Sequence, residues 1–236
     1  MRFENKVALV TGGTGGLGKS VSLALLREGA RVVVTYIYPE EFAALQEAAG
    51  TGAKLEGHHI DLTEEAAAKK LVEEIVSKYG GLHAFVNTVG GYAGGIKLWE
   101  METKTFEHMY AMNVRVGFAM AKAVAPAMVR QKQGAIVNIA AKAAFDHAAG
   151  ASAYASSKAA ALAMMDSLAE DVRGTGVRVN SILPSIMDTA ANRKAMPGAD
   201  FAKWPKTEDI ANVILFLLSD ESRVIHGAAI PVYGAL

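Results

Sequence analysis

The sequence predicts an α/β fold: a single Rossmann-type, doubly wound parallel sheet of about seven strands with helices on both faces. Short, continuously apolar runs alternate with amphipathic stretches, which is typical of a parallel sheet covered on both sides. A glycine-rich turn at residues 11–18 follows the first apolar run. The 236 residues contain no Pro/Ser-rich linker and no block of charge, so we expect residues 1–236 to form one domain.

Short runs of aliphatic and β-branched residues predict the strands. In chain order, strands are expected at residues 7–10, 32–35, 55–60, 84–86, 135–139, 177–183 and 229–232. Longer amphipathic stretches between them predict the helices. These are expected at residues 16–28, 40–49, 64–79, 105–130, 152–173 and 207–218. Local signals mark some helix ends: Thr63 and Thr207 are the expected N-caps, and Gly80 follows the end of the third helix.

Composition excludes several classes of function. Lysine plus arginine and aspartate plus glutamate both number 24, and this balance favours neither nucleic acid nor an anionic membrane as partner. The chain has no cysteine, so it has no disulfide, thiol nucleophile or cysteine-based zinc site, and we expect no metal site. The first residues do not form a signal peptide, and no apolar run approaches the ~18 residues of a membrane span. We therefore expect a cytoplasmic protein.

The glycine-rich turn predicts a dinucleotide site. Gly12, Gly16 and Gly18 lie between a strand and a helix, where glycine permits a tight turn and a close approach of the backbone to a pyrophosphate. The free N–H groups and the dipole of the following helix would attract the phosphates. A tight turn without a ligand is the alternative, but the order strand, turn, helix, strand favours the nucleotide.

The end of the second strand carries neither of the usual signals of cofactor choice. An acid there would bind the adenosine ribose, and a nearby arginine would accept a 2′-phosphate, but residues 35–38 read Thr-Tyr-Ile-Tyr. Glu40 and Glu41 lie slightly further on, and we interpret them as solvated acids at a helix start. Since no basic residue occupies the turn, we favour NAD(H) over NADP(H).

A tyrosine and a lysine four residues apart, Tyr154 and Lys158, predict a proton-transfer site. Residues at this spacing share one face of a helix. Of the seven tyrosines, only Tyr154 has a lysine at this position. An adjacent ammonium is expected to lower the phenol pKa from ~10, which would make the phenol usable in acid–base catalysis.

These motifs resemble the short-chain dehydrogenase/reductase family over nearly the whole chain. The resemblance implies that Tyr154 donates the proton, that Lys158 orients the ribose, and that Asn113 positions a proton-relay water. It also implies that Asp61 contacts the adenine of the cofactor and that Pro184 and Thr189 hold the nicotinamide carboxamide. Residues Asn87 to Gly90 correspond to a variant of the family segment after the fourth strand. The cofactor contacts expected in all are Gly12, Thr14, Gly16, Leu17, Gly18, Tyr36, Asp61, Leu62, Asn87, Gly90, Tyr154, Lys158, Pro184, Ile186 and Thr189.

One departure from the family pattern concerns the substrate. Thirteen residues before Tyr154, where the family has a serine that binds a substrate carbonyl, this chain has Ala141. The dihydropteridine reductase branch also has alanine there, and residues 141–146 and 192–194 resemble that branch. Its substrate is a quinonoid dihydropterin, whose conjugated ring spreads the incoming charge.

The substrate contacts expected are Ala141, Tyr92, Arg193 and Trp204, with a lid around residues 185–204. We expect an NAD(P)H-dependent oxidoreductase that transfers hydride to a small conjugated substrate, with quinonoid dihydropterin as the leading candidate. The alternatives are a carbonyl or alcohol oxidoreductase of the same family and a catalytically weak nucleotide-binding sensor or scaffold. The resemblance also implies a homodimer or homotetramer.

Overall fold

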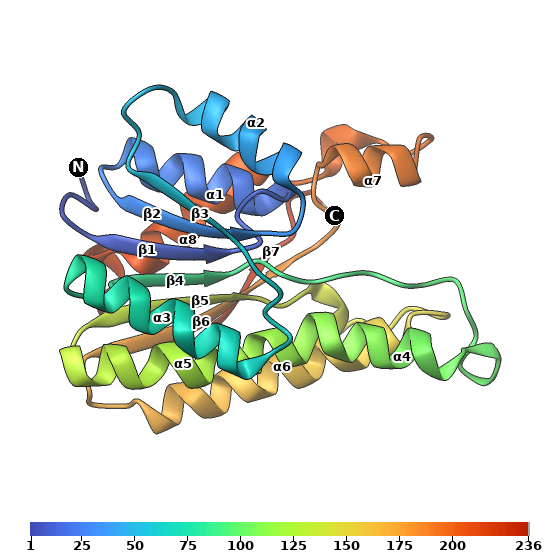
Figure 1. Cartoon of the computed structure of the whole chain (residues 1–236). Helices are drawn as coiled ribbons and strands as arrows, with labels where there is room; N and C mark the ends of the chain where they lie inside the picture. The colour runs from blue at the N-terminus through green and yellow to red at the C-terminus, as the bar shows by residue number, and fades with distance from the viewer. Residues whose placement is uncertain (236) are drawn as a thin grey trace.

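The computed structural model describes residues 1–235 and is built around one seven-stranded parallel sheet, as the sequence predicts (Figure 1). The strand order is β3-β2-β1-β4-β5-β6-β7. The strands are β1 (Val7–Thr11), β2 (Arg31–Tyr36), β3 (Leu55–His59), β4 (Ala84–Asn87), β5 (Gly134–Ile139), β6 (Val177–Pro184) and β7 (Ala229–Val232). The order reverses between β1 and β4, and ligands bind such folds in the crevice at the carboxyl ends of the strands near this point.

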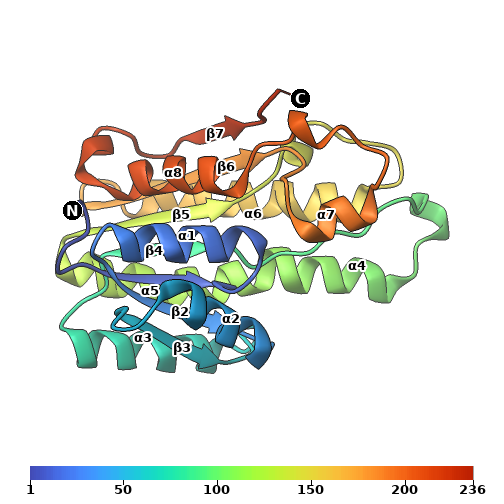
Figure 2. The same cartoon turned by 90° about the horizontal axis from the view of Figure 1, so that it is seen from above.

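Helices cover both faces of the sheet (Figures 1 and 2). The helices are α1 (Gly16–Arg27), α2 (Pro39–Ala49), α3 (Glu65–Tyr79), α4 (Thr103–Tyr110), α5 (Val116–Gln131), α6 (Ser152–Asp171), α7 (Ala190–Ala195) and α8 (Thr207–Leu218). Helices α3, α5 and α6 pack on one face, while α1, α2 and α8 pack on the other. None of the helices within residues 1–235 combines the length and the apolar character needed to cross a membrane.

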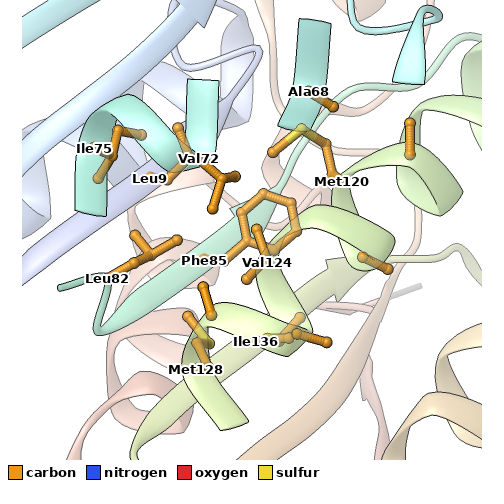
Figure 3. Close-up of a cluster of buried hydrophobic side chains, with 14 of the residues drawn as sticks. Leu9, Ala68, Val72, Ile75, Leu82, Phe85, Met120, Val124, Met128 and Ile136 are labelled. Atoms are coloured by element: carbon orange, nitrogen blue, oxygen red, sulfur yellow. The ribbon is translucent and has the colours of Figure 1, made fainter. Parts of the chain in front are cut away.

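Side chains from successive strand positions fill two separate cores. On the α3–α5 face, Leu9, Phe85 and Ile136 of the central strands meet Val72 and Met120 of the covering helices (Figure 3). On the other face, alternate residues such as Ala8 and Val10 pack beneath α1 and α8. The central strands β1, β4 and β5 are buried along their whole length, which explains their apolar runs in the sequence.

The main difference from the expected elements lies in the long helix predicted at 105–130. It is divided by η2 (Ala111–Arg115), a π-helical turn between α4 and α5. Such turns are rare and often accompany functional sites. The irregular stretch after β6 contains the short helix α7, which periodicity did not predict.

The two predicted N-caps, Thr63 and Thr207, are wrong. Thr63 instead donates from its backbone N and its hydroxyl to Asp61, and α3 begins two residues later without a side-chain cap. Thr207 lies inside the first turn of α8, where its hydroxyl accepts a hydrogen bond from Ser20 at 2.8 Å. In both cases another side chain competes for the hydroxyl that the capping pattern assigns to the helix.

Candidate active site

The glycine-rich turn between β1 and α1 is shaped by close backbone contacts. Gly12 has a φ of +63°, a region that favours glycine. A side chain at Gly18 would overlap the carbonyl oxygen of Gly12. The turn is held to the end of β2, since Thr35 Oγ1 accepts from the Gly12 N–H at 3.1 Å and the Thr35 carbonyl accepts from Gly13.

The N-terminus of α1 fits the phosphates of a dinucleotide. No side chain caps this helix, and its first turn contains no acidic residue. Its leading N–H groups and the positive end of its dipole are therefore left for an anion. Gly16 contributes by its small size, because a Cβ there would lie 2.9 Å from Thr189 Cγ2, at the start of the α7 segment.

Aromatic side chains stack on one another at the end of β2. The ring of Tyr36 lies 4.6 Å from that of Phe42, nearly parallel at 3°, and 5.6 Å from the ring of His59. Glu41 approaches the turn from α2, and its Oε2 accepts a hydrogen bond from Thr14 Oγ1 at 2.8 Å. Glu41 is exposed and lies in the first turn of α2, as expected, and its contact with the glycine-rich turn is an addition that the sequence did not predict.

Asp61 and Leu62 follow β3 at the same edge of the sheet. Asp61 is exposed, and the hydrogen bonds it accepts from Thr63 at 2.9 and 2.8 Å lower the pKa of its carboxyl. Leu62 is buried in the α3–α5 core. An ionised, exposed Asp61 can accept a further hydrogen bond, and its contact with adenine stays a prediction.

Asn87, a predicted cofactor contact, is buried within the sheet. Its Oδ1 accepts from Thr11 Oγ1 at 2.8 Å, and its Nδ2 donates to Asn138 Oδ1 at 3.2 Å. These three side chains form a polar row across β1, β4 and β5 beneath the carboxyl edge. In this structure Asn87 therefore ties together the strands that carry the site.

Asn113 lies in the π-helical turn and connects three segments. Its Oδ1 accepts from the Gly91 N–H at 2.9 Å, and its Nδ2 donates to the Gly91 carbonyl at 3.1 Å and to Ser157 Oγ at 3.0 Å. Ser157 in turn donates to the Tyr154 carbonyl at 2.9 Å. Sequence reasoning missed Ser157, although its position one residue before Lys158 on the catalytic helix was a usable signal.

Tyr154 and Lys158 lie on α6, as predicted, with Lys158 buried. Its Nζ donates to the Ile139 carbonyl at 2.9 Å, and a Cβ on Gly90 would lie 3.0 Å from that nitrogen. Burial lowers the pKa of Lys158 to about 8. Burial, together with the neighbouring Tyr92, raises the pKa of Tyr154 to about 12. The expectation that Lys158 lowers the Tyr154 pKa is therefore wrong for this structure, in which desolvation dominates.

Tyr92 extends the site toward solvent. Its ring meets the Tyr154 ring edge-on, with 4.9 Å between centroids and an interplanar angle of 76°, although 70% of Tyr92 is exposed. A side chain on Gly94 would overlap the Tyr92 hydroxyl, so the present position of the Tyr92 ring requires a glycine there. Ala141 lies just beyond β5 in extended backbone and is buried. The methyl side chain of Ala141 itself offers no hydroxyl.

The segment after β6 is stabilised by contacts among its own residues. Pro184 ends β6, Ile186 is exposed, and Thr189 caps α7 by accepting from the Asn192 N–H at 3.1 Å. Arg193 forms an ion pair with Asp188, in which Nη2 lies 2.7 Å from Oδ2, and its guanidinium lies 4.9 Å from the centre of the Phe201 ring. Trp204 is only 6% exposed and packs against the same ring. Both predicted substrate contacts thus stabilise the segment itself.

A parallel sheet with a phosphate-binding turn beside a buried lysine and a protonated phenol is the arrangement of a dinucleotide-dependent oxidoreductase. A family model described as short chain dehydrogenase matches residues 6–200. The chain belongs to the short-chain dehydrogenase/reductase family, and it is an oxidoreductase that uses NAD(P)(H).

Two curated relatives illustrate the similarity in sequence. A 3-oxoacyl-[acyl-carrier-protein] reductase FabG from Thermotoga maritima is 32% identical over 245 residues, which cover 100% of this chain and 99% of that protein. (+)-Borneol dehydrogenase 2 from Salvia officinalis is 30% identical over 254 residues, covering 99% and 90%. The family predicted from the motifs is thereby confirmed.

Solved structures agree with the fold. A short-chain dehydrogenase/reductase from Mycobacterium ulcerans superposes with a TM-score of 0.94 at 27% identity, covering 100% of this chain and 90% of that one. An NAD⁺-bound xylitol dehydrogenase gives a TM-score of 0.91 at 25% identity, covering 99% and 100%. ElxO with NADP bound gives 0.90 at 25% identity, covering 97% of each chain. Both forms of the cofactor thus occur among similar structures.

Proposed function

We propose that this enzyme reduces a small, flat acceptor whose carbonyl or imine is conjugated, with Tyr154 as the proton donor. NAD(P)H, when bound, supplies the hydride. The observation that carries the proposal is Ala141, which is buried beside the start of the site and offers no hydroxyl to a substrate oxygen. A conjugated acceptor spreads the arriving negative charge, so it depends less on a single hydrogen-bond donor.

The protonation states of the two catalytic side chains support reduction. With a pKa of about 12, the Tyr154 phenol keeps its proton at neutral pH and can donate it. With a pKa of about 8, Lys158 remains mostly protonated at pH 7, one helical turn after Tyr154 on α6. The Asn113–Ser157 contact positions the backbone of the same helix turn.

The exposed Tyr92 ring supports a flat substrate. Its edge-on contact with Tyr154 leaves it at the mouth of the site, where an aromatic ring could stack on the acceptor. We further propose that residues 185–204 act as a lid. Within this lid, Arg193 and Trp204 act by holding Asp188 and Phe201, and the acceptor is bound mainly by Tyr92 and Tyr154.

The relatives favour a second candidate function, the oxidation or reduction of an isolated alcohol or carbonyl. The FabG reductase and the borneol dehydrogenase are named for such substrates. Quinonoid dihydropterin, which the branch resemblance suggests, is one member of the conjugated class. No relative named above is described as acting on a pterin, so we treat it as one acceptor to be tested.

An assay with substitution at residue 141 distinguishes the candidates. Turnover of NADH and NADPH is measured with a quinone, a conjugated ketone, quinonoid dihydropterin and a simple ketone. We expect the conjugated acceptors to react faster, and we expect Ala141→Ser to raise kcat/KM for the simple ketone by ~10²-fold while leaving the conjugated acceptors within ~3-fold. Tyr154→Phe should abolish turnover of every acceptor.

Three outcomes would contradict this assignment. A wild-type preference for the simple ketone would favour the second candidate. If Ala141→Ser changed neither class of acceptor, the argument from the missing hydroxyl would fail. Turnover with no acceptor, despite cofactor binding, would favour the sensor or scaffold alternative.

We also propose that the enzyme is a homodimer or homotetramer. Phe106 on α4 and Phe118 on α5 are exposed, and a second subunit would remove their apolar surface from water. The molar mass measured by light scattering tests this, and a monomer at assay concentration would contradict it.

A further inference from the structure

The contact between Glu41 and Thr14 places a carboxylate at the rim of the glycine-rich turn. Thr14 is buried within that turn, and its hydroxyl donates to Glu41 Oε2 at 2.8 Å. Glu41 is exposed, and within residues 1–235 its Oε1 has no hydrogen-bond partner and its carboxylate has no ion pair. Glu41 therefore has an acceptor oxygen and an uncompensated negative charge beside the turn.

The same junction is where dinucleotide-binding folds distinguish their cofactors. An acid at the end of the second strand accepts from the ribose 2′-hydroxyl, and this requires the strand end to lie beside the turn. Here Thr35 holds the end of β2 against Gly12 at 3.1 Å, but Tyr36 occupies the terminal position and stacks on Phe42. Phe42 directly follows Glu41 on α2, so this stack also fixes the first turn of the helix that carries the acid.

We propose that Glu41, anchored by Thr14, selects NAD(H) over NADP(H), taking the role that the end of β2 does not fill. Its free Oε1 accepts a hydrogen bond from the ribose 2′-hydroxyl. A 2′-phosphate would bring negative charge against a carboxylate, with no basic residue in the turn to compensate it. The proposal rests on the cofactor class and not on the choice of substrate.

A direct binding titration tests this role without any substrate. NADH and NADPH are titrated separately into the full-length protein, and the fluorescence of the bound reduced nicotinamide gives Kd for each. We expect the wild type to bind NADH at least ~10-fold more tightly than NADPH. Glu41→Gln should tighten NADPH binding ~10-fold or more and weaken NADH binding by less than ~5-fold, because an amide keeps the Thr14 contact but removes the charge.

Two further variants control for indirect effects. Glu40→Gln removes the same charge one residue earlier, where the side chain is exposed and makes no hydrogen bond or ion pair within residues 1–235, and it should leave the Kd ratio within ~2-fold. Thr14→Val removes the anchor and should reduce the preference for NADH while Glu41 remains. Circular dichroism establishes that each variant is folded, and Glu41→Ala replaces Glu41→Gln if the latter fails that check.

The proposal is overturned if the wild type binds NADPH as tightly as NADH, or if Glu41→Gln and Glu40→Gln change the ratio equally. Because turnover is not measured, failure here leaves the substrate assignment intact. Conversely, a negative acceptor screen leaves the role of Glu41 unaffected.

Discussion

Burial determines the direction in which the pKa values of Tyr154 and Lys158 are shifted. Lys158 is surrounded by backbone, with its ammonium directed to the Ile139 carbonyl, and this desolvation outweighs the single hydrogen bond. Tyr154 is shielded by the edge of Tyr92 and is held neutral. The Tyr-Lys spacing correctly predicted a shared helix face, but a spacing in sequence carries no information about desolvation, which depends on the loops that close over the helix.

The buried Lys158 should make stability depend on pH. The pKa of Lys158 falls from 10.5 in the unfolded chain to about 8 in the folded one. Between pH 8 and pH 10.5 the unfolded state therefore binds more protons than the folded state. The destabilising effect of Lys158 is thus full below this range and diminishes as the pH rises through it. A Lys158→Met variant removes the buried charge. At pH 7, removing the buried charge should raise the free energy of unfolding of the variant above that of the wild type by up to about 3 kcal/mol. The lost hydrogen bond to the Ile139 carbonyl should reduce this gain by about 1 kcal/mol.

Urea unfolding of both proteins at pH 7 and pH 10 measures this effect. The stability difference should shrink toward the higher pH, since Lys158 is then largely neutral in the folded protein. Tyr154 is unchanged in both proteins, so its own titration cancels in the comparison. A difference that is the same at both pH values would show that Lys158 is not buried as an ammonium.

At the scale of elements, the glycine-rich turn should tolerate added side chains least. In a Gly18→Ala variant the added methyl group would overlap the Gly12 carbonyl, which cannot move without opening the turn. We therefore expect this variant to bind NADH more than ~10²-fold more weakly and to be destabilised by ~1–3 kcal/mol. Fluorescence titration and urea unfolding measure the two effects. Gly15→Ala is the matched control: its φ is −68°, and the added methyl would lie 3.5 Å from the same oxygen. Equal losses in both variants would contradict the steric argument.

The elements that sequence reasoning missed share a physical cause. The π-helical turn at 111–115 depends on Asn113 bonding to Gly91, a residue from another loop, and no local periodicity records that contact. Helix α7 has only six residues, too few for a hydrophobic period, and it is held by Thr189 and the Asp188–Arg193 pair. The contact made by Glu41 was missed for a similar reason, because its partner Thr14 lies 27 residues earlier.

At the scale of the whole molecule, the two cores make the sheet the main source of stability. Phe85 is fully buried at the centre of the α3–α5 core, where it lies in one cluster with side chains from both helices (Figure 3). We expect Phe85→Ala to lower the free energy of unfolding by about 3–5 kcal/mol. Phe216→Ala on α8 is the control: that residue is 37% exposed, and the change should be much smaller. Comparable losses in urea unfolding would contradict this view of the core.

The fold was largely predictable because strands buried on both faces, such as β1, β4 and β5, must be apolar. All seven strands were found within two residues of their ends. The order of the strands in the sheet was not predictable in the same way, since β1 pairs with β4, as in the pair Ala8 and Ala84, which are far apart in the sequence. The family motifs correctly placed Tyr154 and Lys158 on one helix, and their catalytic roles stay a prediction. Their electrostatics depended on tertiary packing and had to come from the structure.

The contact between Gly16 and Thr189 has a practical consequence. Thr189, the N-cap of α7, lies against the turn proposed to bind the phosphates, so a ligand in that turn should affect the order of residues 185–204. Arg193, Lys194 and Lys203 are exposed cleavage points for trypsin in that stretch. The rate at which trypsin cuts there can therefore serve as a label-free gauge of cofactor occupancy, usable before any substrate has been found.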